Sequence, residues 1–515
     1  MSGPKSTVTV AVFVTLSTLT LAKTVVFLPP PSTSYFVYHG NIAAALASRG
    51  HDVWICVPEF LLYKNLVKDQ AVKVLPYGKH LGDIEKRVMK HSRMIEVFWQ
   101  EEFSVSTVNF YYHTREYSRL AHDILSDQTF INAIRNLNAD LFVLDSSIFN
   151  VNIVVLPYLL NTPFAFVGSF HEPPLNRVPF NQGAPDYPMD HMSNRLTFAD
   201  RVVNFLIHLV RVNDLFHDSS LVSRFAAHKP YKSINALAGD AEIFIAETDH
   251  VLDYPRLMLP NTKLVGGSSA SVAKPLIGEL KKFVDESKHG IVVVSFGASV
   301  INVPAPITTK MAAAFRQLDL RVVWNVNLTS PDPGHIRTSL WMPQNDLLGN
   351  EKTKLFVSHC GKNGQYEALY HAVPILCLPI FADQGYNSER IKIKQLGLRA
   401  DIRKISADEL AAMMKEIIYE GNFTENMKKA SRLYRELYKD PKTECAYWLD
   451  HVLKYGGAYM RSAAQDMPWY QLYLLDVITA LLAVTSLILL VVYQLAKLCY
   501  TCLLTRFNDR KRKPD

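Results

Sequence analysis

LFVSHCGKNGQYEALYHAVPILCLPIFADQGYN, residues 355–387, carries the strongest structural pattern in this chain. An apolar run that predicts a β-strand leads into a His, a Gly and an Asn. Helical spacing then begins, and a second apolar run follows. Free backbone N–H groups and the positive end of the helix would face whatever lies above the strand. The pattern therefore predicts an anion-binding site where the strand ends.

The predicted helix has one polar and one apolar side. Asn363 and Glu367 lie four residues apart and therefore share a face. The residues at core spacing are Tyr366, Leu369, Tyr370 and Val373. The polar pair then points at the ligand, where a carboxylate is suited to accept hydrogen bonds from the two hydroxyls of a ribose.

Strand-like and helix-like runs alternate on both sides of this stretch. In the first half the strand-like runs include TVVFLPP (24–30), HDVWICVP (51–58), ADLFVLD (139–145) and FAFVG (164–168). In the second half they include GIVVVSFG (290–297), RVVWNV (321–326) and PILCLPI (374–380), and residues 407–455 have a helical pattern. A composition break at residues 266–275 separates the halves. We expect an α/β protein with two Rossmann-like domains that face a cleft.

Length and composition agree with this architecture. A chain of 515 residues is long enough for two domains and attachments. The net charge is +7, but the basic residues are scattered except at the C-terminus, so nucleic-acid binding is not favoured. Residues 85–137 are irregularly helical, and residues 176–232 are rich in Pro, His and aromatic side chains. We expect both segments to shape an acceptor pocket.

Both ends of the chain predict membrane targeting. Residues 1–22 have the pattern of a cleaved signal peptide, with an uncleaved anchor as the alternative. Residues 477–496 are uncharged and long enough to cross a bilayer as a helix. The basic tail at 497–515 is then cytosolic, and the body lies in the lumen of the endoplasmic reticulum as in a single-pass type I protein. The last residues, KRKPD, resemble a dilysine retrieval signal, although a stop-transfer flank has the same composition. The sequons at Asn327 and Asn422 suit a lumenal body.

The six cysteines do not have the spacing of a disulfide framework or of a metal site. Cys499 and Cys502 would lie at the cytosolic edge of the membrane, in reach of palmitoylation. We expect neither a metal nor another cofactor.

The motif residues resemble the UDP-glycosyltransferase family, and its animal membrane branch in particular. WMPQNDLLG (341–349) and the 355–387 stretch carry the resemblance, supported by SFGA (295–298) and DYPRLMLPNTKLVGG (253–267). It implies the two-domain GT-B fold, with an acceptor-binding domain at 23–267, a linker at 268–285 and a UDP-sugar-binding domain at 286–455. The resemblance also implies donor contacts from Trp341 (uracil), Gln344 (nucleoside), His359, Gly361, Asn363 and Gly364 (diphosphate), Glu367 (ribose), and Asp383 and Gln384 (sugar hydroxyls). By family tendency, Gln384 is compatible with glucose or glucuronic acid more than with galactose.

The chain departs from the family pattern at three places. Cys360 and Ala372 replace glycines. The family's catalytic His, which lies at the start of the first helix and is oriented by an Asp, falls on Tyr35 here. The Asp is present as Asp145, and His39, one helical turn after Tyr35 on the same face, is the candidate for a displaced base.

The leading hypothesis is an inverting transferase that moves a hexosyl or hexuronosyl group from a UDP-sugar to a small lipophilic acceptor. The alternative is a catalytically weak homologue that binds a UDP-sugar and acts as a partner subunit or lipophile-binding protein, which the Tyr35 substitution favours. The nucleotide motif argues against a third hypothesis, that the chain is a structural membrane protein. No motif supports hydride transfer or hydrolysis, and the acceptor and the oligomeric state stay open.

Overall fold

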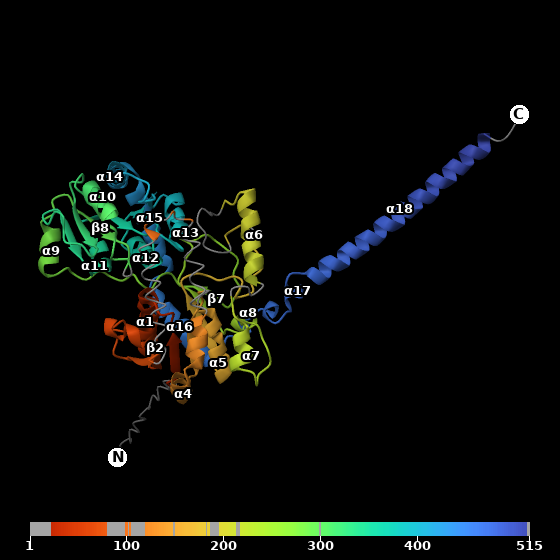
Figure 1. Ribbon diagram of the computed structural model, residues 1–515, viewed down its shortest axis with the longest axis horizontal. Coiled ribbons are helices and arrows are strands. Elements are labelled where there is room, and N and C mark those ends of the chain that lie inside the picture. The colour runs from red at the N-terminus through yellow and green to blue at the C-terminus, as the bar shows by residue number, and fades with distance from the viewer. Residues whose placement is uncertain are drawn as a thin grey trace, which may run out of the picture.

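The computed structural model describes residues 22–79, 98–100, 102, 104, 119–147, 150–181, 183–185, 195–212, 217–297 and 300–511. Residues 1–21 of the predicted signal peptide, most of the segment at 85–118 and residues 512–515 lie outside these ranges, so what the sequence predicts for them stays a prediction. Within them the chain forms two parallel sheets, one in each half. Figure 1 shows the second sheet with its helices, from green to blue-green, above the first sheet, with α1 and α12 near their junction.

The first sheet has seven parallel strands in the order β3-β2-β1-β4-β5-β6-β7. The strands are β1 (Thr24–Leu28), β2 (Asp52–Pro58), β3 (Val72–Tyr77), β4 (Leu141–Asp145), β5 (Phe164–Gly168), β6 (Phe244–Ala246) and β7 (Thr262–Leu264). The helical elements are α1 (Thr33–Ala47), η1 (Glu59–Lys64), α4 (Gln128–Asn136), η2 (Val151–Val154), α5 (Val155–Leu160), α6 (Phe198–Val212), α7 (Ser220–Phe225) and α8 (Ile234–Ala238). The strand order reverses between β1 and β4, which is where open sheets of this kind bind ligands.

The second sheet has six parallel strands in the order β10-β9-β8-β11-β12-β13. The strands are β8 (Ile291–Ser295), β9 (Arg321–Asn325), β10 (Ile336–Ser339), β11 (Thr353–Ser358), β12 (Ile375–Cys377) and β13 (Gly397–Arg399). The helical elements are α9 (Gly278–Asp285), α10 (Ala305–Phe315), α11 (Gln344–Leu348), α12 (Lys362–Tyr370), α13 (Gln384–Ile393), α14 (Ala407–Lys415), the π-helix η3 (Glu416–Glu420) and α15 (Phe423–Leu437). Here the order reverses between β8 and β11, the strand that leads into the anion motif.

The inner strands are apolar runs because helices cover both faces of each sheet. β4, β5 and β8 are buried along their whole length. The predicted α/β architecture is therefore confirmed.

Residues 249–256 fasten the first domain to the second. The Tyr366 hydroxyl donates to Asp249 Oδ2 over 2.6 Å, and the Tyr386 hydroxyl donates to Asp253 Oδ1 over 2.5 Å. Arg390 is fully buried on α13, and its Nη1 lies 3.4 Å from Asp253 Oδ1. Although burial alone would raise the pKa of Asp253, Arg256 and Arg390 hold it well below its usual value. The carboxylate therefore stays ionised in this junction.

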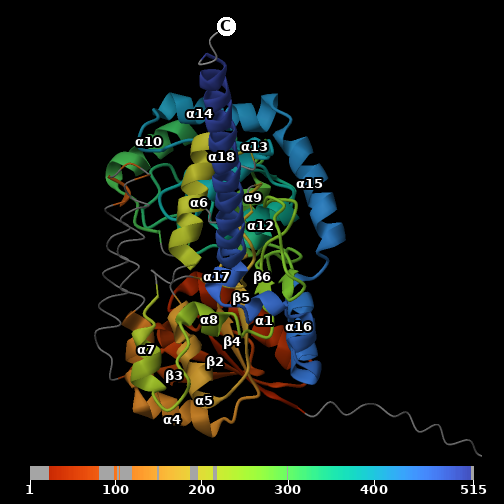
Figure 2. The ribbon, with the colours of Figure 1, turned by 90° about the vertical axis from the view of Figure 1, so that its right-hand side faces the viewer.

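α16 (Pro441–Tyr455) crosses back to the first domain, although residues up to 455 were expected in the second. Its buried residues, Cys445, Ala446, Leu449 and Val452, join the core formed by β1, β2, β4 and α1. Asp450 accepts hydrogen bonds from Arg49 and from His51 Nε2, the latter over 3.0 Å. Figure 2 shows α16, in blue, beside α1 in the lower half of the molecule.

The chain ends in η4 (Ala458–Met460), η5 (Ala463–Gln465), α17 (Trp469–Leu472) and the 37-residue α18 (Leu475–Lys511). In the part of the chain that the structure describes, Leu475–Asn508 is the one helical segment long and apolar enough to cross a membrane. The helix contains the predicted span at 477–496 and continues beyond it. It projects from the globular body in Figure 1.

Candidate functional site

The nucleoside end of the predicted donor site is built from the loop after β10 and the first residues of α11. Trp341 follows β10 and is 70% exposed, which is unusual for a large aromatic side chain. Gln344, the first residue of α11, donates its amide to Glu367 Oε2 on α12. Burial raises the pKa of Glu367 to about 7, and the Gln344 hydrogen bond opposes this rise. The structure therefore brings Gln344 and Glu367 together.

The anion motif occupies the turn from β11 into α12. Gly361 is the N-cap of the helix, and Asn363 and Gly364 lie in its first turn, so backbone N–H groups that have no partner within the helix point out of this end. Asn363 and Glu367 are partly exposed, whereas Tyr366 is buried, as the spacing predicted.

His359 lies across this turn and restricts what can fit there. A Cβ on Gly361 would lie 2.5 Å from His359 Nε2, and one on Gly297 would lie 3.0 Å from the same atom. Gly297 also has φ +82°, which favours glycine. Burial lowers the pKa of His359 to about 4, so the ring is neutral at pH 7 and offers a hydrogen bond rather than a charge.

Asp383 and Gln384 lie at the start of α13. Asp383 accepts from Asn387 Nδ2 over 2.6 Å, and burial raises its pKa. Gln384 Oε1 accepts from the backbone N–H groups of Ile380 and Phe381, over 2.8 and 3.1 Å. The Gln384 carbonyl thus stabilises its own loop, and its amide N–H groups are the atoms that would reach a sugar.

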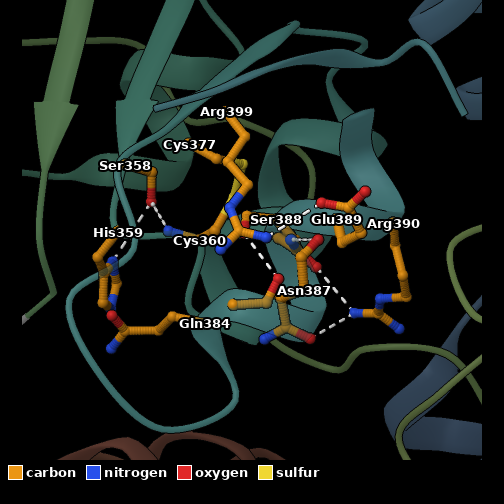
Figure 3. Close-up of a disulfide and its surroundings, with 12 residues drawn as sticks. Ser358, His359, Cys360, Cys377, Gln384, Asn387, Ser388, Glu389, Arg390 and Arg399 are labelled. Atoms are coloured by element: carbon orange, nitrogen blue, oxygen red, sulfur yellow. Dashed lines mark hydrogen bonds and ion pairs between the residues drawn. A yellow bond between two sulfur atoms is a disulfide. The ribbon is translucent and has the colours of Figure 1, made fainter. Parts of the chain in front are cut away.

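A disulfide joins Cys360 and Cys377, whose Cα atoms are 5.3 Å apart. The sequence indicated no disulfide because the two residues are 17 apart, yet they lie at the ends of the adjacent strands β11 and β12. Figure 3 shows the bridge beside Ser358 and His359, with Asn387 and Arg390 of α13 nearby.

The two glycine replacements fall on left-handed backbone. Cys360 has φ +64° and Ala372 has φ +59°, a region in which a Cβ is unfavourable. These conformations explain why the family pattern has glycine at both positions.

The acceptor side is built at the end of β4. His39 Nε2 lies 3.2 Å from Asp145 Oδ2, and both side chains are fully buried. Tyr38 donates its hydroxyl to the same oxygen, and Ser147 N donates to Asp145 Oδ1 over 2.8 Å. Burial, with Asp145 adding to it, raises the pKa of Tyr38 well above its usual value, so the phenol stays protonated. The structure therefore brings the predicted His39 and Asp145 together.

Two further charged residues lie between the domains, and the sequence analysis missed both. Lys362, the first residue of α12, donates to the Ser169 carbonyl after β5, and its ammonium lies 3.8 Å from the centre of the Phe170 ring. Glu247, after β6, accepts from Ser268 N over 3.0 Å. Burial lowers the pKa of Lys362 to about 7 and raises that of Glu247 to about 7. In the sequence Lys362 stands inside the anion motif, but its burial against Ser169 and Phe170 is visible only in the structure.

Comparisons with known proteins identify the family of this chain. The family model described as UDP-glucoronosyl and UDP-glucosyl transferase matches residues 24–513. The chain is 29% identical to UDP-glucuronosyltransferase 2B15 of Homo sapiens over 506 residues and 30% identical to UDP-glucuronosyltransferase 2B17 of Homo sapiens over 511 residues. Each alignment covers 94% of both chains.

Solved glycosyltransferases have the same fold. The calicheamicin glycosyltransferase CalG4 matches with TM-score 0.57 at 14% identity, over 84% of this chain and 98% of its own. Phytolacca americana UGT2 complexed with UDP-2fluoro-glucose and pterostilbene matches with TM-score 0.56 at 15% identity, over 84% of this chain and 100% of its own. These likenesses confirm the GT-B arrangement of two α/β domains. The chain belongs to the UDP-glucoronosyl and UDP-glucosyl transferase family, and it is a UDP-glycosyltransferase whose donor is a UDP-sugar.

Proposed function

We propose that this enzyme transfers a hexosyl or hexuronosyl group, with inversion, to a small lipophilic acceptor, and that His39 is the general base. The observation that carries the proposal is the buried pair of His39 and Asp145 at the end of β4. A hydrogen-bonded carboxylate is the partner that orients an imidazole for proton transfer.

The contact with the Asp145 carboxylate favours one tautomer of His39. Asp145 Oδ2 accepts, so His39 Nε2 carries the proton, and the lone pair lies on Nδ1. His39 Nδ1 is buried and has no hydrogen-bond partner among the residues that the structure describes. A buried polar atom without a partner is costly, and an acceptor hydroxyl would satisfy it. Because the ring is fully buried, the acceptor reaches Nδ1 only when the covering side chains move aside.

The proposed reaction is one displacement. The acceptor oxygen forms a bond to the anomeric carbon as the bond to the UDP oxygen breaks, and UDP leaves with the electron pair. The acceptor proton passes to His39 Nδ1, and Asp145 stabilises the imidazolium. The start of α12 faces the developing charge on the diphosphate.

The lipophilic acceptor class rests on the anchor and on the fold. α18 is apolar enough to span a bilayer, so acceptors dissolved in that bilayer would be close to the enzyme. One structure of the same fold is that of Phytolacca americana UGT2 complexed with UDP-2fluoro-glucose and pterostilbene. We place the body in the lumen of the endoplasmic reticulum and the residues after α18 in the cytosol.

The test is transfer from a panel of UDP-sugars to alcohols and phenols by the full chain in detergent. His39→Ala and Asp145→Asn should each lower transfer to alcohols by roughly 10² to 10⁴, and transfer to the more acidic phenols by less. Tyr35→His should raise transfer to alcohols, because it adds an imidazole one turn earlier on α1. Tyr38→Phe is the control, since it removes the other donor to Asp145 and keeps the base.

An active wild type whose rates are untouched by His39→Ala would exclude His39 as the base. A wild type that binds UDP and transfers nothing across the panel would favour the alternative of a binding homologue.

A further inference from the structure

Helix α6 (Phe198–Val212) has its polarity reversed relative to an ordinary surface helix. Its buried side carries Asn204, His208 and Arg211, whereas its outer side carries valine, leucine and phenylalanine. Surface helices of soluble domains normally bury the apolar stripe and expose the polar one. α6 therefore requires an explanation beyond the packing of its own domain.

Polar contacts hold the inner side of α6 to the acceptor domain. Asn204 Nδ2 donates to the Ala184 carbonyl over 3.1 Å, and Arg211 forms an ion pair with the buried Glu172. Asn235 Nδ2 donates to the Arg211 carbonyl over 3.0 Å. These bonds fix which side of the helix faces outward.

The outer side is a continuous apolar surface from Phe198 to Val210, along about 18 Å of helix at 1.5 Å per residue. Phe198 is 76% exposed and Leu206 is 54% exposed. Val202, Val203 and Val210 are exposed between and beyond them. A run of apolar side chains this long marks an interaction surface rather than scattered exposure.

The position of α6 indicates what covers it. His208, on the inner side, packs against Tyr473 with ring centres 5.8 Å apart, and α18 begins only two residues later, at Leu475. Two residues span at most about 7 Å. Figures 1 and 2 both show α6 on the side of the body from which α18 departs. The bilayer entered by α18 is therefore the nearest apolar phase.

We propose that the outer face of α6, made by Phe198, Val202, Val203, Leu206 and Val210, lies in the interfacial region of the leaflet from which α18 enters the membrane. The inference rests on the proposed anchoring by α18. A helix in this place buries its apolar face at the boundary of headgroups and acyl chains. Arg201, exposed on the same helix, would extend to the headgroups.

Such docking gives the acceptor domain a fixed height and tilt over the bilayer. α18 alone is one tether, whereas α18 with α6 makes two attachments joined by the His208–Tyr473 contact. Through Ala184 and Glu172, α6 is bonded to the segment that also lines a small hollow with Pro173, Val178 and Arg256. The membrane would then lie directly beside the acceptor half of the enzyme.

The test uses the full chain with an environment-sensitive nitrobenzoxadiazole label on single cysteines, in phosphatidylcholine nanodiscs with or without a shallow doxyl-labelled lipid. The background is Cys499→Ser with Cys502→Ser, since Cys56 and Cys445 are buried and Cys360 and Cys377 are bridged. Val203→Cys and Leu206→Cys report on α6. Glu279→Cys, exposed on α9 in the other domain, is the matched control, and Val484→Cys reports on α18.

We expect doxyl lipid to quench the labels at 203 and 206 at least twofold, and the label at 279 not at all. Quenching at 484 without quenching at 203 and 206 would overturn the proposal for α6 and leave the anchor intact. Absence of quenching at 484 would overturn the anchor itself, and the α6 proposal with it. Labels at 203 and 206 that escape quenching but shift to the blue in a concentration-dependent way would show that a second copy covers the face, which also overturns the proposal.

Discussion

At the scale of single residues, the donor site contains two groups that titrate near neutrality in opposite senses. Glu367 has a pKa raised to about 7 and is ionised above that pH, whereas Lys362 has a pKa lowered to about 7 and is charged below it. The carboxylate was predictable from the motif. The lysine was not, because its burial depends on Ser169 and Phe170, which lie 193 and 192 residues earlier in the chain.

Replacement of Glu367 tests the ribose contact. Glu367→Ala should weaken UDP binding by about 1.5 to 3 kcal/mol, the range for a hydrogen bond to a charged group. Because the carboxylate protonates as pH falls through about 7, wild-type affinity should decline on the acid side and that of the variant should not. Titration calorimetry from pH 5.5 to 8.5 measures both, with the exposed Glu351→Ala as control. Unchanged affinity in folded Glu367→Ala would remove the residue from the site.

Replacement of Lys362 tests how the charge of the lysine affects UDP affinity as the pH changes. Lys362→Met keeps an apolar stem beside Phe170 but removes the ammonium at the start of α12. The variant should bind UDP about 10-fold more weakly than wild type at pH 6, equivalent to about 1.4 kcal/mol, and almost equally at pH 8.5, where the wild-type lysine is neutral. Lys354→Met, exposed on β11, is the control. A loss that is constant with pH would show that Lys362 acts by packing rather than by charge.

At the scale of elements, the sequence was sufficient to predict a strand wherever an apolar run was long and bounded by turn residues. β1, β2, β4, β5, β8, β9 and β12 all lie within the predicted runs, and β11 begins two residues before the run that starts at Leu355. β10, with the sequence IRTS, and the three-residue β13 escaped prediction, because edge strands need no apolar run. α16 was placed in the wrong domain, since its amphipathic pattern does not say which core its apolar face meets. The Cys360–Cys377 bridge depends on strand adjacency, which the sequence does not state.

The end of α12 offers a test of the backbone argument. Ala372 follows the helix with φ +59°, where a Cβ costs roughly 1 to 2 kcal/mol. Ala372→Gly relieves that strain, but the greater entropy of its unfolded chain costs roughly 0.4 to 1 kcal/mol, so a net gain of up to about 1.6 kcal/mol is expected. Ala412→Gly, exposed within α14, should instead destabilise by about 0.5 to 1 kcal/mol. Urea midpoints that fall for both variants would contradict the strain argument.

At the scale of the whole molecule, α16 links the end of the second domain to the first. Asp450 gathers Arg49, His51 and Lys454, and these hydrogen bonds hold its pKa below the usual value despite the opposing effect of burial. Asp450→Ala should destabilise the first domain by about 2 to 3 kcal/mol at pH 7, with the exposed Lys442→Ala as control. A carboxylate whose pKa is lowered in the folded protein stabilises the fold above its unfolded pKa of about 3.9, and this stabilisation is lost as the pH falls through the folded pKa. The free energies of unfolding of wild type and variant should therefore converge only in acid. Urea unfolding across pH measures this convergence.

Topology is the largest-scale prediction, and the structure supplies its reporters. Asn327 and Asn422 are both exposed, one after β9 and one before α15, so neither sequon is closed to a glycosylating enzyme. Lys497 and Arg506 follow the apolar core of α18, and basic residues beyond a span favour the cytosol. In sealed microsomes we therefore expect added protease to remove a C-terminal tag and spare the body. We also expect a glycosidase-sensitive mass shift that Asn327→Gln with Asn422→Gln abolishes. Digestion of the body with survival of the tag would show the opposite orientation. A body in the cytosol would also leave both sequons unmodified.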